Sequence, residues 1–358
     1  MFFGGEWSIK SLIDKLCKQK TLETDEYLYI LDNFDDNTLE YCSGIARNIA
    51  KSHFGNGIYI RGLIEISSYC KNNCLYCGLR RSNNCALRYR LNKEEILMSC
   101  QEGYALGFRT FVLQGGEDAY YTDEIMCDIV STIRQKYPDC AITLSIGERS
   151  RQSYQKLYES GADRFLLRHE TADTHHYSLI HPKELTLENR LECLNNLKEI
   201  GFQTGCGFMV GSPFQENYHL AKDLCFINSF KPQMVGIGPF LPHKDTPFKD
   251  KQKGDLKLTL LLVCLVRIAN ETVLLPATTA LATLHPKGRE YGIFCGANVV
   301  MPNLSPLQVR KKYMLYDGKV SSGNESAQQI SNLENQLNAI GYKIQYGRGD
   351  YFALPDIK

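Results

Sequence analysis

The sequence lacks a dominant sign of charge. Its 41 Lys and Arg residues are balanced by 40 Asp and Glu residues, and no basic block stands out along the chain. A nucleic-acid-binding protein usually carries a basic patch or stripe that contacts phosphates, so this class is disfavoured. The expected partner is therefore a small molecule or another protein.

Long apolar runs are also missing. The longest strongly apolar run, Leu258 to Val266, has about half of the roughly 20 residues that a membrane-spanning helix needs. The N-terminus, Met-Phe-Phe-Gly-Gly-Glu-Trp, has no basic stretch followed by an apolar core, which a secretory signal would have. We expect a soluble, cytoplasmic protein with no membrane partner.

Cysteine is plentiful, but the 14 residues are scattered through a chain without an export signal. Thiols in such proteins normally stay reduced, so a disulfide framework is not expected. Most of these cysteines should be small buried hydrophobes. The group at Cys70, Cys74 and Cys77 needs another explanation.

The pattern of apolar residues predicts an α/β protein. Residues 1–54 are interpreted as a helical lead-in, with Asn37 and Glu40 placed like a capping box. From Ile58 onward, short apolar runs alternate with longer helical stretches, as in repeated βα units. Eight strands are predicted: Ile58–Ser67, Thr110–Gln114, Ile142–Ile146, Arg164–His169, Thr204–Val210, Val235–Gly238, Val273–Thr278 and Asn298–Met301.

Eight parallel strands close most economically into a (β/α)8 TIM-type barrel. We predict that this barrel spans residues 55–302 and that residues 303–358 form a C-terminal lid and tail, with a helix near Ser326–Ile340. Polar or unusual residues follow the first, second, fourth and sixth strands. In a barrel of this type, that rim is the catalytic face.

Cys70, Cys74 and Cys77 place three thiols within eight residues of one predicted loop. A cubane iron–sulfur cluster normally takes four thiolates, so three would leave one iron open for a small molecule. The alternative is a structural zinc site completed by Cys85 or a distant His, but no second C-x2-C or His pair follows at a suitable distance. Three inert buried cysteines are disfavoured in so polar a segment.

The C-x3-C-x2-C motif, with Tyr76 before its last cysteine, resembles the signature of the radical S-adenosylmethionine (SAM) superfamily. Within that superfamily, the chain is similar to the [FeFe]-hydrogenase maturase family HydE from about residue 40 to residue 316. Six blocks carry this resemblance: Arg61–Ser67, Cys74–Arg81, Leu113–Asp118, Arg168–Ala172, Met234–Phe240 and Pro276–Ala280.

The resemblance implies the cofactors and their ligands. One [4Fe–4S] cluster would bind to Cys70, Cys74 and Cys77, and its electron would cleave SAM to methionine and a 5′-deoxyadenosyl radical. The residues implied for SAM are Tyr76, Gly116, Glu117, Glu170, Arg190 and Met234. Taken without the resemblance, Gly115-Gly116-Glu117 is an ordinary turn, Arg190 a helix-surface ion pair and Met234 a core residue.

The resemblance also implies a substrate cavity inside the barrel. Its residues would be Gln114, Arg164, Thr278, Thr279, Met301 and Tyr313. Arg164 is a charge on an apolar strand, so its alternative role is an ion pair in the neighbourhood of Asp163 or with another acid of the rim. The implied substrate is a small organometallic or amino-acid-derived molecule. The implied partners are an electron donor such as ferredoxin or flavodoxin and other hydrogenase maturases, including a GTPase scaffold.

The chain departs from many HydE proteins at one point, because its last cysteine is Cys295. Many members carry three further cysteines near the C-terminus for an auxiliary cluster, whereas residues 319–329 supply none here. We therefore expect a single cluster. The departure reopens the relationship with methylornithine synthase, so a mutase of that type is one alternative. A non-catalytic zinc-binding scaffold is the alternative from another class.

Overall fold

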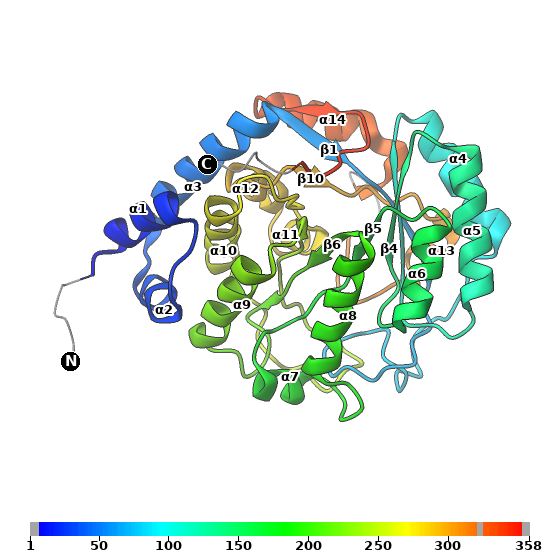
Figure 1. Ribbon diagram of the computed structural model, residues 1–358, viewed down its shortest axis with the longest axis horizontal. Coiled ribbons are helices and arrows are strands. Elements are labelled where there is room, and N and C mark those ends of the chain that lie inside the picture. Colours follow the sequence, from blue (N-terminus) through cyan, green and yellow to red (C-terminus); the bar gives the residue numbers. More distant parts are fainter. Residues whose placement is uncertain (1–6, 321–324, 353–358) are drawn as a thin grey trace.

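The computed structural model describes residues 7–320 and 325–352, in which strands and helices alternate around a barrel (Figure 1). The strands are β1 (Gly57–Ile60), β2 (Gly62–Ser67), β3 (Thr110–Gly115), β4 (Ala141–Ser145), β5 (Arg164–Leu166), β6 (Gln203–Cys206), β7 (Met209–Val210), β8 (Met234–Val235), β9 (Gly238–Pro239), β10 (Val299–Val300) and β11 (Lys343–Gln345).

Six of these strands form one parallel sheet in the order β2-β3-β4-β5-β6-β8. The two edges of this sheet are joined by the remaining segments. Met234 bridges to Leu274, Pro276 bridges to Val299, and β10 pairs in parallel with β1. Because β1 runs directly into β2, the ring closes, and the predicted TIM-type barrel is confirmed.

Several predicted strands are shorter than expected. The predicted strand Thr204–Val210 divides into β6 and β7 at Gly207, whose φ is +153° and whose backbone lies against Gly236: a Cβ there would sit 2.0 Å from the carbonyl oxygen of Gly236. Val273–Thr278 forms only the two isolated bridges of the ring. Pro276 lacks an N–H, which prevents a regular ladder there.

The helices that follow the strands cover the outside of the barrel (Figure 1). They are α4 (Lys93–Ala105), α5 (Asp123–Lys136), α6 (Arg151–Glu159), α7 (Thr174–Ile180), α8 (Leu187–Ile200), α9 (Asn217–Phe230), α10 (Leu256–Ala269), α11 (Thr279–Leu284), α12 (Gly288–Phe294), α13 (Leu307–Arg310) and α14 (Ile330–Ala339), with a 3-10 turn η2 (Ala327–Gln329) before the last. Within the described ranges, no helix is long and apolar enough to cross a membrane.

The N-terminal part consists of three helices, α1 (Ile9–Gln19), α2 (Thr24–Asn33) and α3 (Asp36–Phe54). The predicted capping box at Asn37 and Glu40 is wrong. The N-cap of α3 is Asp35, whose carboxylate accepts hydrogen bonds from the backbone N–H and the hydroxyl of Thr38 at 2.8 and 2.7 Å. A carboxylate directly before the first turn also interacts favourably with the helix dipole.

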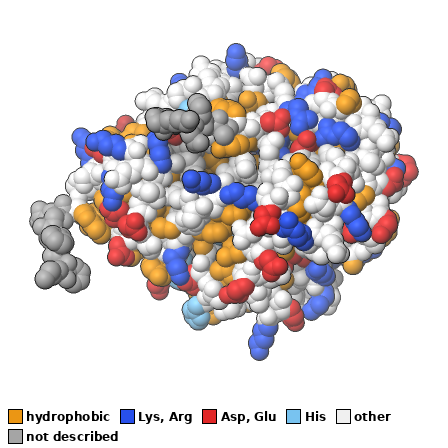
Figure 2. Space-filling view, viewed as in Figure 1, with side chains coloured by type: hydrophobic (Ala, Val, Ile, Leu, Met, Phe, Trp, Pro, Cys, Tyr) orange, Lys and Arg blue, Asp and Glu red, His pale blue; other side chains and the backbone are white. Residues whose placement is uncertain are grey.

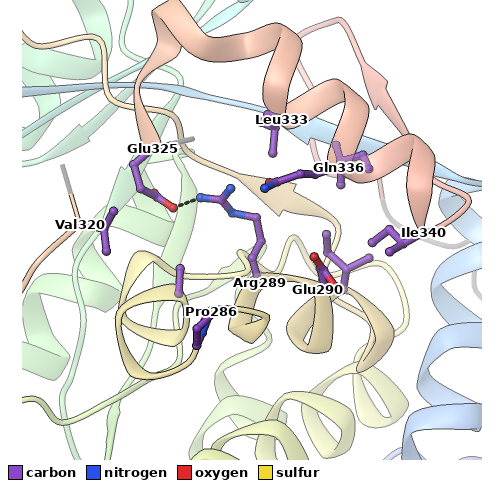
Figure 3. Close-up of a pocket in the computed structure, with 11 residues that line it drawn as sticks. Pro286, Arg289, Glu290, Val320, Glu325, Leu333, Gln336 and Ile340 are labelled. Carbon is purple, nitrogen blue, oxygen red and sulfur yellow. Dashed lines mark ion pairs between the residues drawn. The ribbon is translucent and has the colours of Figure 1, made fainter. Parts of the chain in front are cut away.

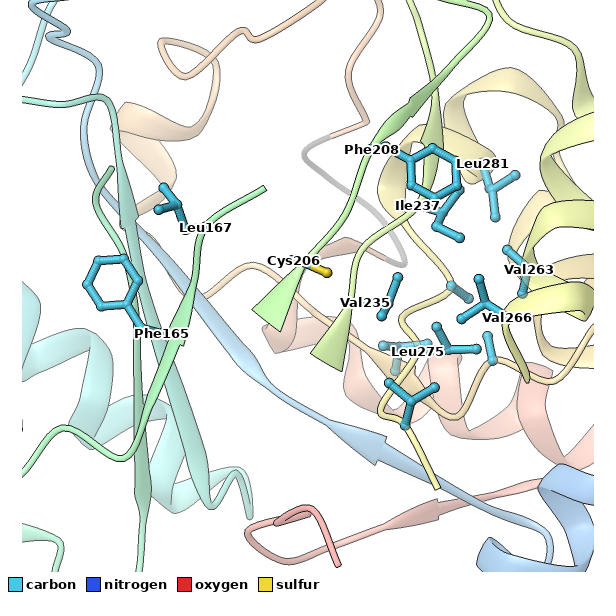
Figure 4. Close-up of a cluster of buried hydrophobic side chains, with 14 of the residues drawn as sticks. Phe165, Leu167, Cys206, Phe208, Val235, Ile237, Val263, Val266, Leu275 and Leu281 are labelled. Atoms are coloured by element: carbon cyan, nitrogen blue, oxygen red, sulfur yellow. The ribbon is translucent and has the colours of Figure 1, made fainter. Parts of the chain in front are cut away.

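The apolar run around residues 258–266 belongs to α10, which is buried on almost every side. This helix packs between α3, α9 and α12. Toward the barrel, Val263 and Val266 of α10 and Leu275 belong to one buried cluster (Figure 4). Cys206 lies in the same cluster, as expected for a cysteine that acts as a small hydrophobe. All 14 cysteines are free thiols.

Charges on the surface are mixed. In the view of Figure 2, acidic and basic side chains are interspersed over the helices, with no large region of one sign. Such a face produces little long-range field, in keeping with the balanced composition.

Candidate active site

The three clustered cysteines lie on the long loop between β2 and α4. The guanidinium of Arg88 stabilises this loop by donating to four backbone carbonyls, those of Ser68, Leu79, Arg80 and Asn83. The C-terminal segment also contacts the loop, because the N–H of Gly78 donates to the carbonyl of Leu315 at 2.8 Å. These hydrogen bonds hold the loop that carries the thiols in one conformation, although the loop has no regular secondary structure.

All three thiols line one cavity of about 300 Å³ at the carboxyl ends of the barrel strands. This is the face where TIM-type barrels hold their active sites. Of the predicted residues, the cavity brings together Cys70, Cys74, Tyr76, Cys77, Gln114, Gly116, Glu117, Glu170, Arg190, Thr278 and Tyr313. The predicted residues Arg164, Met234, Thr279 and Met301 are not among its walls in the described chain.

The three thiols of the cavity are buried. Burial raises the pKa of Cys70 and Cys74, and it raises the pKa of Cys77 to about 12. Buried thiols of this kind lose their protons when a metal centre compensates the negative charge. Over the residues described, no three Cys, His, Asp or Glu side chains lie close enough together to hold a single metal ion.

Glu117 follows β3 and faces the thiols across the cavity. Its Oε2 is buried without a hydrogen bond in the described structure and lies 3.4 Å from Nζ of Lys71. Gly147 makes room for this side chain, because a Cβ at Gly147 would lie 1.9 Å from Cγ of Glu117. Gly116 permits a similar approach to the cysteine loop, since its Cβ would lie 2.2 Å from the carbonyl oxygen of Tyr69.

Glu170 has a left-handed backbone with a φ of +66°. Such a conformation costs on the order of 1–3 kcal/mol for a residue other than Gly and is concentrated at functional sites. Two hydrogen bonds impose it: Glu170 N–H donates to the carbonyl of Gly207 at 3.0 Å, and Met209 N–H donates to the carbonyl of Glu170 at 3.3 Å. The result places the carboxylate in the cavity.

The Glu170 carboxylate has a positive neighbour but an incomplete set of hydrogen bonds. Its Oε2 lies 3.0 Å from Nη2 of Arg168, although the geometry is not that of a hydrogen bond. Nε and Nη2 of Arg168 are also buried without a hydrogen-bond partner among the described residues. Polar groups left this way are costly unless a ligand satisfies them, so this wall fits a polar, charged molecule.

Arg190, on α8, enters the cavity from the side. Its Nε donates to Glu148 at 2.6 Å and its Nη1 donates to the carbonyl of Arg168 at 3.0 Å. Burial by itself lowers the pKa of Arg190, but Tyr177, Glu148 and Glu117 outweigh it, so the pKa lies above its ordinary value. The guanidinium remains charged, and the surface ion pair considered from the sequence becomes a buried one at the cavity wall.

Tyr76 is positioned by His181 at the end of α7. The Tyr76 hydroxyl lies 3.1 Å from Nε2 of His181, and the two rings meet edge to face at 5.4 Å. Burial lowers the pKa of His181 to about 3, so the imidazole is neutral. Tyr76 therefore forms a rigid apolar wall beside Cys77.

Three predicted substrate residues lie at the inner part of the cavity. Nε2 of Gln114 donates to the hydroxyl of Tyr313 at 3.3 Å. The Oγ1 of Thr278 is buried and has no hydrogen bond within the described ranges. The hydroxyl and amide groups therefore face a space where a small polar substrate fits.

The structure places Arg164 elsewhere, at the opposite end of the barrel. Its guanidinium pairs with Asp350 at 2.6 Å and donates to Thr110 at 3.2 Å. Arg164 and Thr110 are the first residues of β5 and β3, so their side chains lie at the amino ends of the strands. Arg164 therefore forms an ion pair, as in its alternative role, but the partner is Asp350 of the C-terminal tail and not an acid of the catalytic rim.

Met234, Met301 and Thr279 also lie outside this cavity. Met234 packs with Leu274 and Val299, and Met301 lies against the same cluster. Thr279 is the first residue of α11, and its hydroxyl donates to Glu325 at 3.1 Å. Thr278 lines the cavity and these three residues do not. The difference depends on the direction of each side chain, which the barrel geometry sets.

Other cavity residues were not predicted, including Ser145, Arg168, Met209 and Tyr316. Ser145 ends β4 and was recognisable by the rule that polar residues at strand ends face the active site. Arg168 lay within a block that carried the family resemblance. No sequence feature near Met209 or Tyr316 indicates that these residues line the cavity.

A second cavity, of about 150 Å³, lies between α11, α12 and α14 (Figure 3). Arg289 and Glu325 form an ion pair in it, and apolar residues such as Leu333 and Ile340 line the rest. Burial lowers the pKa of Arg289 to about 10, so the side chain stays charged near neutral pH. This cavity contains no cysteine, and its central charges compensate one another.

Comparison with known proteins agrees with this geometry. Residues 64–224 match the Radical SAM superfamily. The chain is 44% identical over 299 residues to the [FeFe] hydrogenase maturase subunit HydE of Thermotoga maritima, covering 84% of this chain and 85% of that protein. It is 28% identical over 302 residues to 3-methylornithine synthase of Methanosarcina acetivorans, covering 82% and 84%. The crystal structure of methylornithine synthase (PylB) superimposes with a TM-score of 0.83 at 26% identity, covering 93% of this chain and 97% of that one.

Proposed function

Because the chain belongs to the HydE family within the radical SAM superfamily, we propose that it acts in the assembly of the [FeFe]-hydrogenase active site. It is a radical SAM enzyme, and 3-methylornithine synthase and biotin synthase are its relatives. One observation carries the proposal: three thiols share a single cavity with buried polar atoms that make no hydrogen bond in the described structure.

The proposed cofactors are one [4Fe–4S] cluster on Cys70, Cys74 and Cys77, and SAM. When bound, the cluster supplies the electron that cleaves SAM to methionine and a 5′-deoxyadenosyl radical. The remaining polar groups divide the work of holding SAM. Glu117 suits the ammonium group, since it lines the cavity with the thiols and one of its carboxylate oxygens makes no hydrogen bond in the described structure.

Arg190 and Glu170 suit the other end of SAM. A guanidinium presents donors to a carboxylate, and the Glu170 oxygen that makes no hydrogen bond in the described structure can accept from ribose hydroxyls. The neutral His181 holds Tyr76 in one position. The C-terminal segment excludes water, because Leu315 and Tyr316 line the cavity next to the loop.

The proposed substrate is a small organometallic iron species that bears CO, cyanide and cysteine. Gln114, Thr278 and Tyr313 supply amide and hydroxyl groups beside the SAM site, and these can donate to cyanide nitrogens or a carboxylate. The proposed partners are a ferredoxin or flavodoxin as electron donor and the other hydrogenase maturases, including a GTPase scaffold. The 14 free thiols suit the reducing cytoplasm, where we propose that the protein acts.

The test is an anaerobic reconstitution with iron and sulfide. We expect a brown protein that forms 5′-deoxyadenosine from SAM and activates apo-hydrogenase when the other maturases are present. SAM cleavage with conversion of lysine to methylornithine, and without hydrogenase activation, would favour the mutase alternative. A colourless protein that retains zinc and does not cleave SAM would contradict both enzymatic functions.

A further inference from the structure

The segment that contains the cysteine loop carries charge of one sign only. Between Ser67 and Lys93, the sequence has no Asp or Glu and has the basic residues Lys71, Arg80, Arg81, Arg88, Arg90 and Lys93. The balance of charge over the whole chain conceals this asymmetry, because the compensating acidic residues lie in other segments.

Half of these charges are neutralised by ion pairs. Lys71 lies 3.4 Å from Glu117, Arg90 lies 2.7 Å from Asp118, and Lys93 lies 2.7 Å from Asp128. Arg80, Arg81 and Arg88 have no acidic partner in the part of the chain that the structure describes. Arg80 donates to the amide oxygen of Asn73 at 2.9 Å, and Arg88 donates only to backbone carbonyls. The loop therefore keeps an uncompensated positive charge.

A hollow of about 280 Å³ opens on the outer side of this loop. Arg81 and Arg88 line it, together with Asn83 and Asn84, and no acidic residue does. Cys70 lines both this hollow and the active-site cavity. Cys70 therefore lies between the proposed cluster and the hollow in the protein surface.

Exposed apolar side chains lie at the hollow and next to its lining residues. Tyr69 lines it and is 37% exposed. Leu87, between the lining residues Ala86 and Arg88, is 66% exposed. The guanidinium of Arg90 lies 3.9 Å from the centre of the Tyr69 ring. Tyr and Arg are enriched at the centres of protein interfaces, where they combine apolar area with hydrogen-bonding capacity. We call the surface formed by Tyr69, Arg81, Leu87 and Arg88 the cysteine-loop face.

We propose that the cysteine-loop face is the docking surface for a small acidic electron-carrier protein that reduces the cluster by way of Cys70. This inference rests on the proposed function, because it requires the cluster. The reduced carrier loses one electron, the cluster gains it, and no proton is transferred. The positive face attracts an acidic partner at long range and speeds the encounter, most strongly at low salt.

The character of the face suits a transient complex. Electron-transfer encounters use small interfaces, commonly below about 1,200 Å² in total. A few arginines around a shallow hollow with two exposed apolar residues provide such an interface. The carrier can then dissociate after each electron, which repeated SAM cleavage requires.

The test compares two reductants on the reconstituted full chain. Arg81→Glu is the variant of choice, because Arg81 is exposed and its backbone N–H, not its side chain, bonds to the carbonyl of Asn72. Lys18→Glu on α1 is the matched control: it changes the charge equally on an exposed residue of a helix that packs against α2 and α10. Each protein is reduced with dithionite or with a reduced acidic flavodoxin. The rate of cluster reduction, followed by its visible absorbance without SAM, and the rate of 5′-deoxyadenosine formation are both measured at low and high salt.

With flavodoxin at low salt, we expect Arg81→Glu to react on the order of three- to tenfold more slowly than wild type, a difference that shrinks at high salt. Lys18→Glu should match wild type, and all three proteins should match with dithionite. Equal rates for Arg81→Glu and Lys18→Glu with flavodoxin would overturn the docking assignment. The docking assignment would also be overturned if Arg81→Glu lost as much of its rate with dithionite as with flavodoxin, because such a loss would indicate damage to the cluster.

Two further outcomes separate this inference from the proposed function. If wild type fails to cleave SAM with dithionite, the proposed function is refuted, and the docking proposal is refuted with it. If Arg81→Glu accepts electrons normally but no longer activates hydrogenase with the other maturases, the face binds a maturation partner. The electron-carrier assignment is then overturned, while the proposed function stands.

Discussion

Glu65 on β2 and Lys319 in the C-terminal segment form an ion pair inside the molecule, with side chains that are 0% and 6% exposed. The second carboxylate oxygen of Glu65 accepts from Asn303 at 3.0 Å, and Lys319 also donates to the carbonyl of Tyr313 at 3.1 Å. Tyr313 lines the active-site cavity. The pair therefore fastens the segment that covers the cavity to the strand that leads into the cysteine loop.

We predict that Lys319→Met destabilises the protein by about 3–5 kcal/mol, because it leaves Glu65 as a buried charge without its ionic partner. Lys311→Met, at an exposed position nearby in sequence, should change stability by less than about 0.5 kcal/mol. Urea unfolding of the two variants measures the difference.

The double variant Glu65→Gln with Lys319→Met isolates the ion pair. Because both charges are removed, its loss of stability should be smaller than that of Lys319→Met alone. An equal or larger loss in the double variant would mean that packing around these side chains, and not the buried charge, dominates.

A second prediction concerns iron. The reconstituted wild type should hold about four irons per chain, the content of one cubane. Cys70→Ala, Cys74→Ala and Cys77→Ala should each abolish SAM cleavage, because two thiolates do not hold a cubane with one open iron. Cys127→Ala serves as the control, since Cys127 is a partly buried thiol on α5 outside the cavity. Normal deoxyadenosine production by any of the three loop variants would refute the ligand assignment.

A third prediction separates the substrate site from the SAM site. Thr278→Val removes a buried hydroxyl that has no partner within the described structure, at almost constant shape. We expect it to reduce hydrogenase activation more than uncoupled deoxyadenosine formation, by on the order of tenfold if one substrate hydrogen bond of about 1.4 kcal/mol is lost.

Thr143→Val is the matched control for Thr278→Val. Thr143 carries the same kind of unpartnered buried hydroxyl, but it lies on β4 outside the cavity. It should leave both activities close to wild type. If Thr278→Val reduces both activities equally, Thr278 belongs to the SAM site or to the structural core.

The fourth prediction concerns pH. His169 accepts the N–H of Gly207 at Nδ1, at 3.2 Å, and its Nε2 lies 3.2 Å from Asp223. Burial lowers the pKa of His169 to about 3. An unfolded His binds a proton near pH 6.5, so its contribution to stability is present above that pH and is lost as the pH falls toward 3.

Wild type should therefore lose about 1.7 kcal/mol more stability than His169→Gln between pH 6.5 and pH 5, because the slope rises from about 0.7 kcal/mol per pH unit at pH 6.5 toward about 1.4 at pH 5. Glutamine keeps an amide near Asp223 but does not titrate. Urea unfolding at both pH values measures this. Parallel losses in the two proteins would show that His169 is protonated in the folded state.

Much of the fold was predictable because its signals are local. The alternation of short apolar runs with helical stretches indicated βα units, and eight such units favour a closed barrel. The breaks within the strands were not predictable. They arise where Gly207 approaches Gly236 and where Pro276 bridges to Val299, and such contacts depend on how distant segments pack.

The sequence by itself determined the cysteine loop, because three thiols within eight residues of one loop can reach the same metal centre. It also indicated the rim residues Glu117 and Glu170, since both come shortly after predicted strands and both line the cavity. Only the tertiary structure decided the role of Arg164. Successive side chains on a barrel strand differ in direction and depth, and its partner Asp350 is 186 residues away. The sequence does not show at which end of the barrel the charge of such a residue lies. The fold places Arg164 at the end where the C-terminal tail supplies Asp350 as its partner.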